Sequence, residues 1–284
     1  MGIELPCERE ADLVRERLLD TRPEIPGIPD EWLSEFLTDG KYVRPRLLFL
    51  SYYAAGGEVV GQDVVDAAAS IELIHCASLV HDDILDDAET RRGLLSAPLL
   101  IGEPLSTLLG DALFTEAFWL GSNLGPQVAQ LTREGVQDMI VGEAREMVHD
   151  DPDWEPDEAE QVAREKTASL LGTACATGAV LAEADEDIRH RFRRFGVQIG
   201  VAFQAVDDVL DVAGDDETGK PMGIDARVGA PNLARALGGD GADEARQIAM
   251  ERVERAFELL APIPETEGKK RLLDLAEFVS TRER

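Results

Sequence analysis

Residues 64–87 read VVDAAASIELIHCASLVHDDILDD and join a long apolar helix pattern to a cluster of carboxylates at its end. Apolar residues recur at three- and four-residue spacing from Val64 to Leu85, which places them on one face of an α-helix. The predicted helix is longer than most helices of globular proteins, so it would cross a whole domain. The segment therefore favours a helical bundle with acidic side chains at the end of one helix.

The same periodicity recurs along most of the chain and defines the fold class. Further helices are expected at Leu105–Leu120, Gln130–Val148, Glu158–Ala182, Ile188–Val212 and Ala245–Leu260. No convincing run alternates as a β-strand does, and the expected loops lack the length and composition of interdomain linkers: Thr21–Pro29, Asp150–Pro156 and Gly214–Pro231. The sequence therefore predicts an all-α fold with a single domain over residues 1–284.

The composition is strongly acidic, with 57 Asp and Glu against 28 Lys and Arg and a formal net charge of -29. A surface of this sign repels nucleic acid and anionic membranes, which argues against functions that require either partner. The lysines are scarce and stand only at positions 41, 166, 220, 269 and 270. Acid enrichment with scarce lysine is typical of cytosolic proteins of halophiles, and it makes each remaining lysine a stronger functional candidate.

The cysteines indicate a reducing compartment. Cys7, Cys76 and Cys175 are odd in number and widely spaced, so they cannot all pair within the chain and show no metal-ligand spacing. No signal peptide is recognised, and no apolar run approaches the expected length of a membrane span. We therefore expect a soluble cytoplasmic protein without stable membrane insertion.

Two copies of the pattern Asp-Asp-x-x-Asp, at residues 82–86 and 207–211, carry the candidate chemistry. Each lies toward the end of an apolar helix, where side chains four residues apart share a face. Carboxylates crowded on one face repel each other unless a hard cation such as Mg²⁺ binds them together with substrate phosphates. The alternative is that these residues form solvated acidic helix faces, which a single copy of the pattern would fit. Two copies, each followed by basic residues, favour a metal site.

Basic residues stand close to both motifs. Arg91 and Arg92 follow the first, Lys220 follows the second, Lys166 lies within a predicted helix, and Lys41 and Arg44 stand where another helix begins. Arginine offers a fork of donors to phosphate oxygens and lysine offers a compact charge, so these positions suit anionic ligands. A structural ion pair is the alternative for any one of them.

Taken in order, the motifs resemble those of the trans-isoprenyl diphosphate synthases, the family that contains farnesyl and geranylgeranyl diphosphate synthases. The matching segments are Gly40-Lys41-x-x-Arg44-Pro45, Glu72-x-x-His75-x-x-Ser78-Leu79-x-His81-Asp82-Asp83-x-x-Asp86, Arg91-Arg92-Gly93, Gly110-Asp111-Ala112-Leu113, Lys166-Thr167, Phe203-Gln204-x-x-Asp207-Asp208-x-x-Asp211 and Gly219-Lys220-Pro221-x-Gly223-x-Asp225. The resemblance implies a helical bundle around a central apolar cavity. It also implies a trans-prenyltransferase that condenses isopentenyl diphosphate with an allylic diphosphate, several Mg²⁺ ions per active site, and a homodimer.

The resemblance assigns roles to individual residues. The metal ligands would be Asp82, Asp83, Asp86, Asp207, Asp208 and Asp211, and the catalytic residues would be Asp82, Asp86, Asp207, Lys166 and Lys220. The allylic diphosphate would be bound by Arg91, Lys166 and Lys220, with Thr167 and Gln204 beside it. The diphosphate of isopentenyl diphosphate would be bound by Lys41, Arg44, His75 and Arg92.

Three segments depart from the family pattern. Leu94-Leu95-Ser96-Ala97 replaces a stretch of polar-Pro-Thr-x-His, and Gly229-Ala230-Pro231-Asn232 lacks a diphosphate-binding lysine. Glu143 stands where the family usually has glutamine. The departures concern substrate affinity, whereas the predicted metal ligands are intact.

Product length is expected to depend on the residues about one helical turn before Asp82, which are Ala77 and Ser78. Bulky aromatic residues at these positions stop chain growth early in the family, so small ones imply geranylgeranyl diphosphate or a longer product. Phe114, Phe118 and Trp119 are candidates for closing the tunnel at a deeper level, with ordinary core packing as their alternative.

Two other functions share parts of this pattern. A class I terpene cyclase has the helical fold and the first motif, but its second metal motif usually mixes Asn or Asp, Ser or Thr, and Glu. A non-catalytic partner subunit would account for Ala230 and the altered segment after Gly93, but such subunits commonly lose an aspartate motif. The second Asp-Asp-x-x-Asp and the pair Lys41 and Arg44 favour chain elongation.

Overall fold

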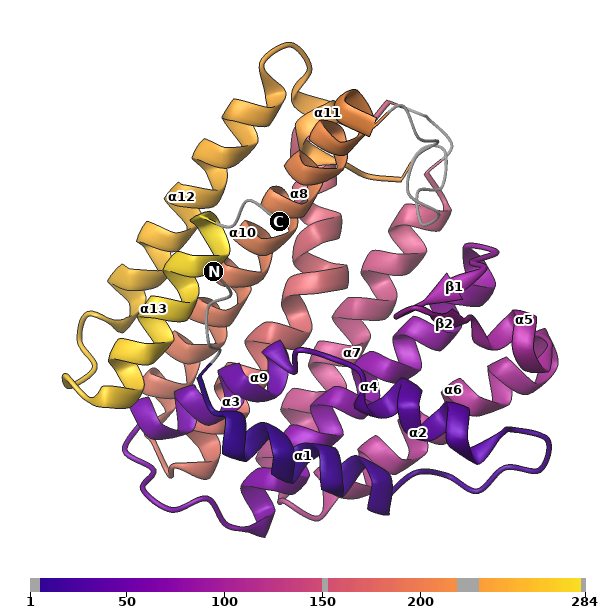
Figure 1. The fold of residues 1–284 in the computed structure, drawn as a ribbon. Helices are drawn as coiled ribbons and strands as arrows, with labels where there is room; N and C mark the ends of the chain where they lie inside the picture. The colour runs from indigo at the N-terminus through magenta and orange to yellow at the C-terminus, as the bar shows by residue number, and fades with distance from the viewer. Residues whose placement is uncertain (1–5, 150–152, 219–229, 282–284) are drawn as a thin grey trace.

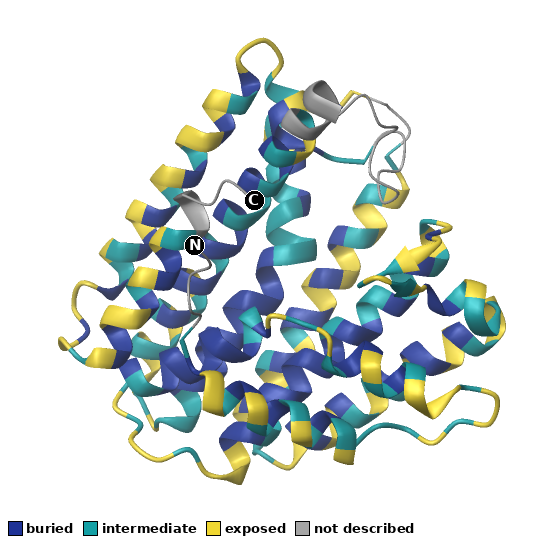
Figure 2. Cartoon of the chain, in the orientation of Figure 1, coloured by how far each residue is buried: buried dark blue, intermediate teal, exposed yellow. Residues whose placement is uncertain are grey.

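Helix α4 (Gln62–Leu85) forms over the apolar segment that the sequence singles out, and its inward face is buried. The computed structural model describes residues 6–149, 153–218 and 230–281, and in these residues helices surround α4 and α9 (Ser169–Leu181) (Figure 1). The N-terminal helices α1 (Glu8–Asp20), α2 (Asp30–Thr38) and α3 (Val43–Ala54) precede α4. The buried positions follow the inner faces of the helices, which makes the bundle interior apolar (Figure 2).

The remaining elements continue the bundle. They are β1 (Thr90–Arg91), β2 (Leu94–Leu95), α5 (Ala97–Ile101), α6 (Glu103–Ser122), α7 (Pro126–Met147), α8 (Pro156–Val162), the π-helix η1 (Ala163–Ala168), α10 (Glu186–Thr218), α11 (Leu233–Leu237), α12 (Gly241–Leu260) and α13 (Glu267–Thr281). The strands pair antiparallel as a minimal hairpin, which the sequence analysis did not predict. The all-α fold class is confirmed, and the predicted long helices agree with the observed ones to within a few residues at most ends.

Helix α9 packs against α3, α7 and α10 because its sequence is made largely of small residues. A β-carbon on Gly178 would lie 2.3 Å from the carbonyl oxygen of Leu48 in α3. A β-carbon on Gly196 in α10 would lie 2.5 Å from the carbonyl oxygen of Leu171 in α9. Helices can approach this closely only where side chains are absent, so these glycines set the spacing around the core.

Two sequence expectations are wrong. The loop predicted at Gly214–Pro231 is wrong at its start, because α10 continues to Thr218, and residues 219–229 of this prediction lie outside the described residues. The expectation that no segment approaches the length of a membrane span also fails, since α4 is long and apolar enough to cross one. Within the most apolar window of α4, 72% of the residues are buried inside the protein, as in the core helix of a bundle.

Candidate active site

The first aspartate motif lies at the carboxyl end of α4, where Asp82 is half-buried and Asp86 is the first residue beyond the helix. Burial raises the pKa of Asp82 to about 7, opposed by the positive charge of Lys166 and reinforced by the carboxylates of Glu143 and Asp86. An aspartate in this setting needs a nearby positive charge to remain ionised at neutral pH. Lys166 supplies part of that charge.

Asp83 points away from its neighbours into the protein and is 1% exposed. Its Oδ1 accepts a hydrogen bond of 2.7 Å from Nε of Arg91 in β1, and Nη2 of Arg91 lies at 2.7 Å from the same oxygen. Ser96 closes the other end of the hairpin by donating its hydroxyl to the carbonyl of Ala88. The ion pair of Asp83 and Arg91 therefore holds the hairpin against α4. The metal-ligand role of Asp83 and the diphosphate-binding role of Arg91 stay predictions.

The second motif lies on α10 and is anchored by Asp208, which is 4% exposed. Its Oδ1 accepts a hydrogen bond from Nε2 of Gln204 at 2.9 Å, and its Oδ2 accepts one from the backbone N–H of Leu233 at 2.7 Å. Burial raises the pKa of Asp208 to about 6, although both hydrogen bonds oppose the rise. Asp207 is half-buried and Asp211 is exposed, so these two carboxylates stand nearer to solvent.

Lys166 lies in the π-helix η1, which packs against α7 and against α10 with the second motif. Its Nζ lies 2.6 Å from Oε2 of Glu143 and 2.8 Å from Oε2 of Glu146, both on α7. Beside it, the hydroxyl of Thr167 donates to Oε1 of Gln204 at 3.1 Å, which continues the hydrogen-bond chain to the second motif. Short π-helical turns inside α-helices are frequent at functional sites, because they change the direction in which side chains point.

A second group of basic residues lies between the beginning of α3 and the middle of α4, around the buried carboxylate of Glu72. Nη2 of Arg92 lies 3.6 Å from Oε1 of Glu72, and Nη1 of Arg92 donates to the carbonyl of Phe36 at 2.8 Å. Burial lowers the pKa of Arg44, and Nε of Arg44 is buried without a hydrogen bond to any described residue. Burial, followed by the charges of Arg44, Arg92 and Arg91, holds the pKa of His75 well below its ordinary value. The imidazole is therefore neutral and lies close to the positive charges of these arginines.

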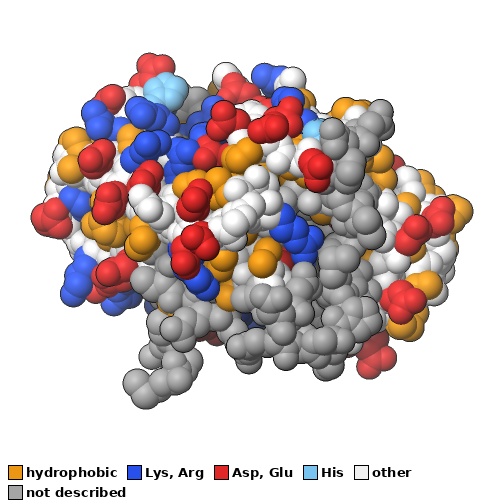
Figure 3. Space-filling view, turned by 90° about the horizontal axis from the view of Figure 1, so that it is seen from above, with side chains coloured by type: hydrophobic (Ala, Val, Ile, Leu, Met, Phe, Trp, Pro, Cys, Tyr) orange, Lys and Arg blue, Asp and Glu red, His pale blue; other side chains and the backbone are white. Residues whose placement is uncertain are grey.

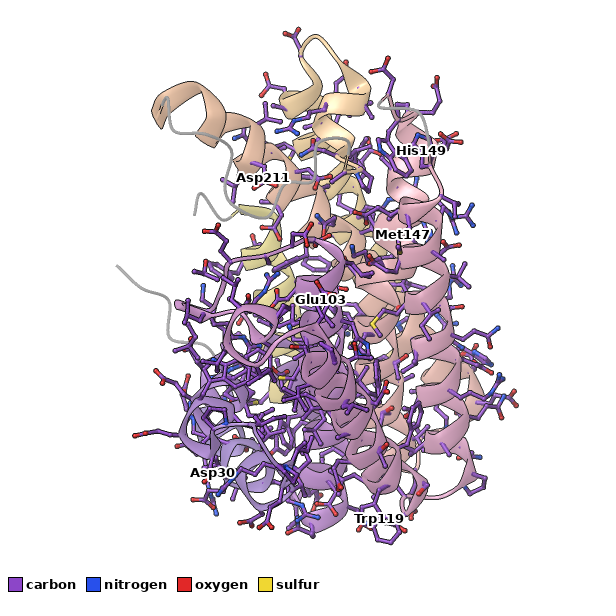
Figure 4. The ribbon with its side chains drawn as sticks, turned by 90° about the vertical axis from the view of Figure 1, so that its right-hand side faces the viewer. Asp30, Glu103, Trp119, Met147, His149 and Asp211 are labelled. Carbon is purple, nitrogen blue, oxygen red and sulfur yellow. The ribbon has the colours of Figure 1, made fainter. Side chains whose placement is uncertain are left out.

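Two predicted binding residues remain, Lys41 and Lys220. Lys41 is exposed and follows Gly40, whose β-carbon would lie 3.5 Å from Nη2 of Arg92, so Lys41 stands at the edge of this basic group. Lys220 lies outside the described residues, and its role stays a prediction. Asp211 lies toward one end of the molecule and Trp119 toward the other (Figure 4), which places the charged site at one end of the bundle.

The donor set fits a hard divalent cation such as Mg²⁺, because it consists of carboxylates whose mutual repulsion a cation would relieve. Within the described residues, no group of three or more Asp, Glu, His or Cys side chains is placed to hold a cation alone. Mg²⁺ commonly binds one or two carboxylates and completes its coordination with water and substrate phosphate. The arrangement therefore suits a cation that binds together with a diphosphate.

The residues predicted to control product length are placed one turn before Asp82. Ala77 is fully buried, and Ser78 is partly exposed and donates its hydroxyl to the carbonyl of His75 at 2.8 Å. Two residues of α6 were also predicted to close the tunnel at a deeper level, but Phe118 is 40% exposed and Trp119 is 61% exposed. These two aromatic side chains lie on the surface, so the expectation that they close an interior tunnel is wrong for this chain.

Three site residues were missed by sequence reasoning. Glu146 was passed over and Glu143 was noted only as a departure, although they lie three residues apart on α7, a spacing that brings side chains together on one helix face. Glu72 was quoted in a motif without a role, and its burial among arginines is a tertiary feature that no local pattern shows. The three-residue spacing of Glu143 and Glu146 was the one sequence feature that could have indicated these site residues.

Comparison with known proteins identifies the family. The model of the polyprenyl synthetase family matches residues 30–263. The short chain isoprenyl diphosphate synthase of Methanothermobacter thermautotrophicus is 32% identical over 97% of this chain and 96% of its own. The octaprenyl diphosphate synthase of Escherichia coli is 30% identical over 86% of this chain and 87% of its own. The crystal structure of polyprenyl synthase from Caulobacter crescentus, complexed with calcium and isoprenyl diphosphate, superposes with a TM-score of 0.86 at 25% identity, covering 98% of this chain and 96% of that one.

Proposed function

Because the chain belongs to the polyprenyl synthetase family and is a trans-prenyltransferase, we propose that its two aspartate motifs and Lys166 bind the allylic diphosphate. The observation that carries the proposal is the position of Lys166, whose charge acts on Asp82 of the first motif. Thr167 next to it is hydrogen-bonded to Gln204, which in turn holds Asp208 of the second motif. Asp82, Asp86, Asp207 and Asp211 are the ligands that we propose for Mg²⁺, with Asp83 and Asp208 beside them.

These residues suit the ionisation of an allylic carbon–oxygen bond. Bound Mg²⁺ would supply charge neutralisation for the departing diphosphate. Lys166 adds a point charge at the same place and, as an ammonium, offers three donors to diphosphate oxygens. The apolar bundle keeps water away from the reactive carbon, because its inner helix faces carry buried aliphatic side chains.

We propose that isopentenyl diphosphate occupies the basic group formed by Lys41, Arg44, His75 and Arg92. Arg44 has a buried guanidinium nitrogen without a described hydrogen-bond partner, and the neutral His75 can donate from one ring nitrogen. Arginine forks match the geometry of phosphate oxygens. His75 and Asp82 stand seven residues apart in α4, about two helical turns, so the two diphosphates would lie along one face of the helix.

The test is a high-salt assay with Mg²⁺, isopentenyl diphosphate and a series of allylic diphosphates of increasing length, with products sized by chromatography. We expect a longer prenyl diphosphate, and we expect Asp82→Ala and Asp207→Ala to abolish it. Asp138→Ala, which removes an exposed carboxylate of α7, is the matched control and should retain activity. A cyclic hydrocarbon would identify a terpene cyclase, and no turnover by folded protein would identify a non-catalytic partner subunit.

The product is proposed to be geranylgeranyl diphosphate or longer, since Ala77 and Ser78 place small side chains one turn before Asp82. The relatives named above make products of different lengths, so the family alone does not set the length. Chain length therefore depends on side chains of this protein.

We also propose a homodimer formed through α6 and α7. These neighbouring helices expose large apolar side chains, among them Leu108, Trp119 and Ile140, which are 56%, 61% and 58% exposed. A second copy would remove this surface from water, a favourable exchange for apolar area. Light scattering should give twice the chain mass, and Trp119→Glu with Ile140→Glu should give the mass of one chain.

The acidic composition supports a further proposal, that the protein works in a cytoplasm rich in salt. Acidic and basic side chains are interspersed over the face seen from above (Figure 3), while the whole chain carries a net charge of -29. The excess negative charges repel one another, and salt screens this repulsion. The melting temperature should rise steadily with potassium chloride up to molar concentrations, and a flat or falling curve would contradict the proposal.

A further inference from the structure

Lys166 is held by two carboxylates from α7. Its ammonium lies 2.6 Å from Oε2 of Glu143 and 2.8 Å from Oε2 of Glu146, and the three side chains are only 26%, 16% and 9% exposed. The group therefore carries one positive and two negative charges in a partly desolvated place. A diphosphate that approaches Lys166 meets a net negative cluster instead of a free cation.

Glu143 is bound to this lysine through one oxygen only. Its Oε2 contacts Nζ of Lys166, while its Oε1 is buried and has no hydrogen-bond partner among the described residues. A buried carboxylate oxygen without a partner is costly, so the lysine contact is what holds this side chain in place. The same carboxylate adds to the negative charge around Asp82.

The backbone fixes this contact. A β-carbon on Gly142 would lie 2.5 Å from the backbone nitrogen of Lys166, so α7 and η1 touch at the residue next to Glu143. Neither segment can move away without losing this packing. Glu143 therefore remains within reach of Lys166 whether or not a diphosphate is bound.

We infer that Glu143 is a positioning residue that orients Lys166 in the empty site and weakens the binding of diphosphates, both the allylic substrate and the inorganic diphosphate that is released. The inference rests on the proposed function of Lys166. An ammonium has three donors, of which the glutamates occupy two, so the third can reach a diphosphate oxygen while Glu143 stays bound. The consequence is a site that binds its anion less tightly and releases it more readily than one with a neutral side chain at this position.

The test measures the binding of inorganic diphosphate at saturating Mg²⁺ by calorimetry, without turnover. Glu143→Gln keeps the shape of the side chain and removes its charge, and it should tighten binding at least about threefold. Glu165→Gln is the matched control, because Glu165 carries the same charge next to Lys166 in sequence but pairs with Arg145. It should leave the affinity unchanged.

A double-mutant cycle separates an effect through Lys166 from general repulsion. Introduced into Lys166→Met, Glu143→Gln should give no gain in affinity. An equal gain in both backgrounds, or no gain in the wild-type background while wild type binds diphosphate, overturns the inference alone. Absence of diphosphate binding by wild type would overturn the proposed function and this inference with it.

Discussion

Gly110 on α6 leaves the space that the imidazole of His81 on α4 occupies, since a β-carbon there would lie 2.1 Å from Nε2 of His81. The ring also lies 3.4 Å from the carbonyl oxygen of Thr107 and 3.8 Å from Oδ1 of Asp111. His81 directly precedes Asp82. The missing side chain of Gly110 thereby lets His81 pack against α6 next to the first aspartate motif.

Gly110→Ala should destabilise the protein by about 1–3 kcal/mol, because the added methyl group must displace a packed ring. It should also lower prenyltransferase activity by shifting Asp82. Denaturant unfolding and the chain-length assay measure the two effects. Gly61→Ala is the control, since its β-carbon meets no atom within 4 Å, and it should cost less than about 1 kcal/mol.

The metal-free protein should be more stable at about pH 5 than at about pH 8. Asp82 has a pKa of about 7 in the folded chain against an ordinary 3.8, so the folded state retains a proton that the unfolded chain has released. Its stabilising contribution is complete below pH 3.8 and is lost as the pH rises to about 7. Melting curves in a chelator should show a difference of several degrees, which Asp82→Asn should reduce and added Mg²⁺ should reverse. A difference of the same size in Asp82→Asn would refute this origin.

Asn232→Ala should cost about 1–2 kcal/mol of stability. Oδ1 of Asn232 accepts the backbone N–H of Arg235 at the start of α11, and its Nδ2 donates to the carbonyl of Asp208. The substitution removes both bonds and loosens the segment that holds Asp208, so the concentration of Mg²⁺ needed for half-maximal activity should rise. Asn123→Ala, which removes an exposed hydrogen bond at the end of α6, should change neither quantity appreciably.

Glu72→Gln should destabilise the protein by about 2–4 kcal/mol, because it leaves the charges of Arg44 and Arg92 buried without their carboxylate. Isopentenyl diphosphate would restore the missing negative charge, so it should raise the melting temperature of the variant more than that of wild type. Glu8→Gln is the control, since Glu8 pairs with Arg46 but is 59% exposed. Equal ligand-induced shifts in wild type and Glu72→Gln would show that no diphosphate enters the basic group.

Ser78→Phe should shorten the product. The side chain of Ser78 is small, partly exposed and one turn from Asp82, so a phenyl ring there would narrow the path of the growing chain. Leu79→Phe adds a ring at the next position of the same helix and should leave the product length unchanged. Products of equal length from Ser78→Phe and wild type would remove this residue from the chain-length determinants.

The long helices could be predicted because each carries an apolar face with a regular period. Turn-forming residues predicted the end of a helix less well than the apolar period predicted its course. Gly214, Asp215 and Asp216 favour a turn, yet α10 continues through them to Thr218. The π-helical turn at Lys166 left no trace in periodicity, since a single extra residue barely shifts the pattern.

The sequence predicted which residues belong to the candidate site, but it did not predict the contacts between them. Asp83 and Asp82 are neighbours in one motif, but helix geometry sends them to different faces, and only one of them is buried against Arg91. Aromatic character alone suggested an interior position for Trp119, which lies on the surface. The place of a single side chain such as Trp119 is decided by packing between distant segments, which no local sequence pattern shows.

Helix α4 carries Ala77, Ser78, Asp82 and Asp83, and Asp86 caps its carboxyl end. Each residue advances about 1.5 Å along the axis, so a substitution before Asp82 lies at a fixed, stepwise distance from the carboxylates. Such a change leaves the register of the carboxylates untouched. Under the proposed role of Ala77 and Ser78, single mutations on α4 would give lineages lipids of new length while the bond-forming chemistry is inherited intact.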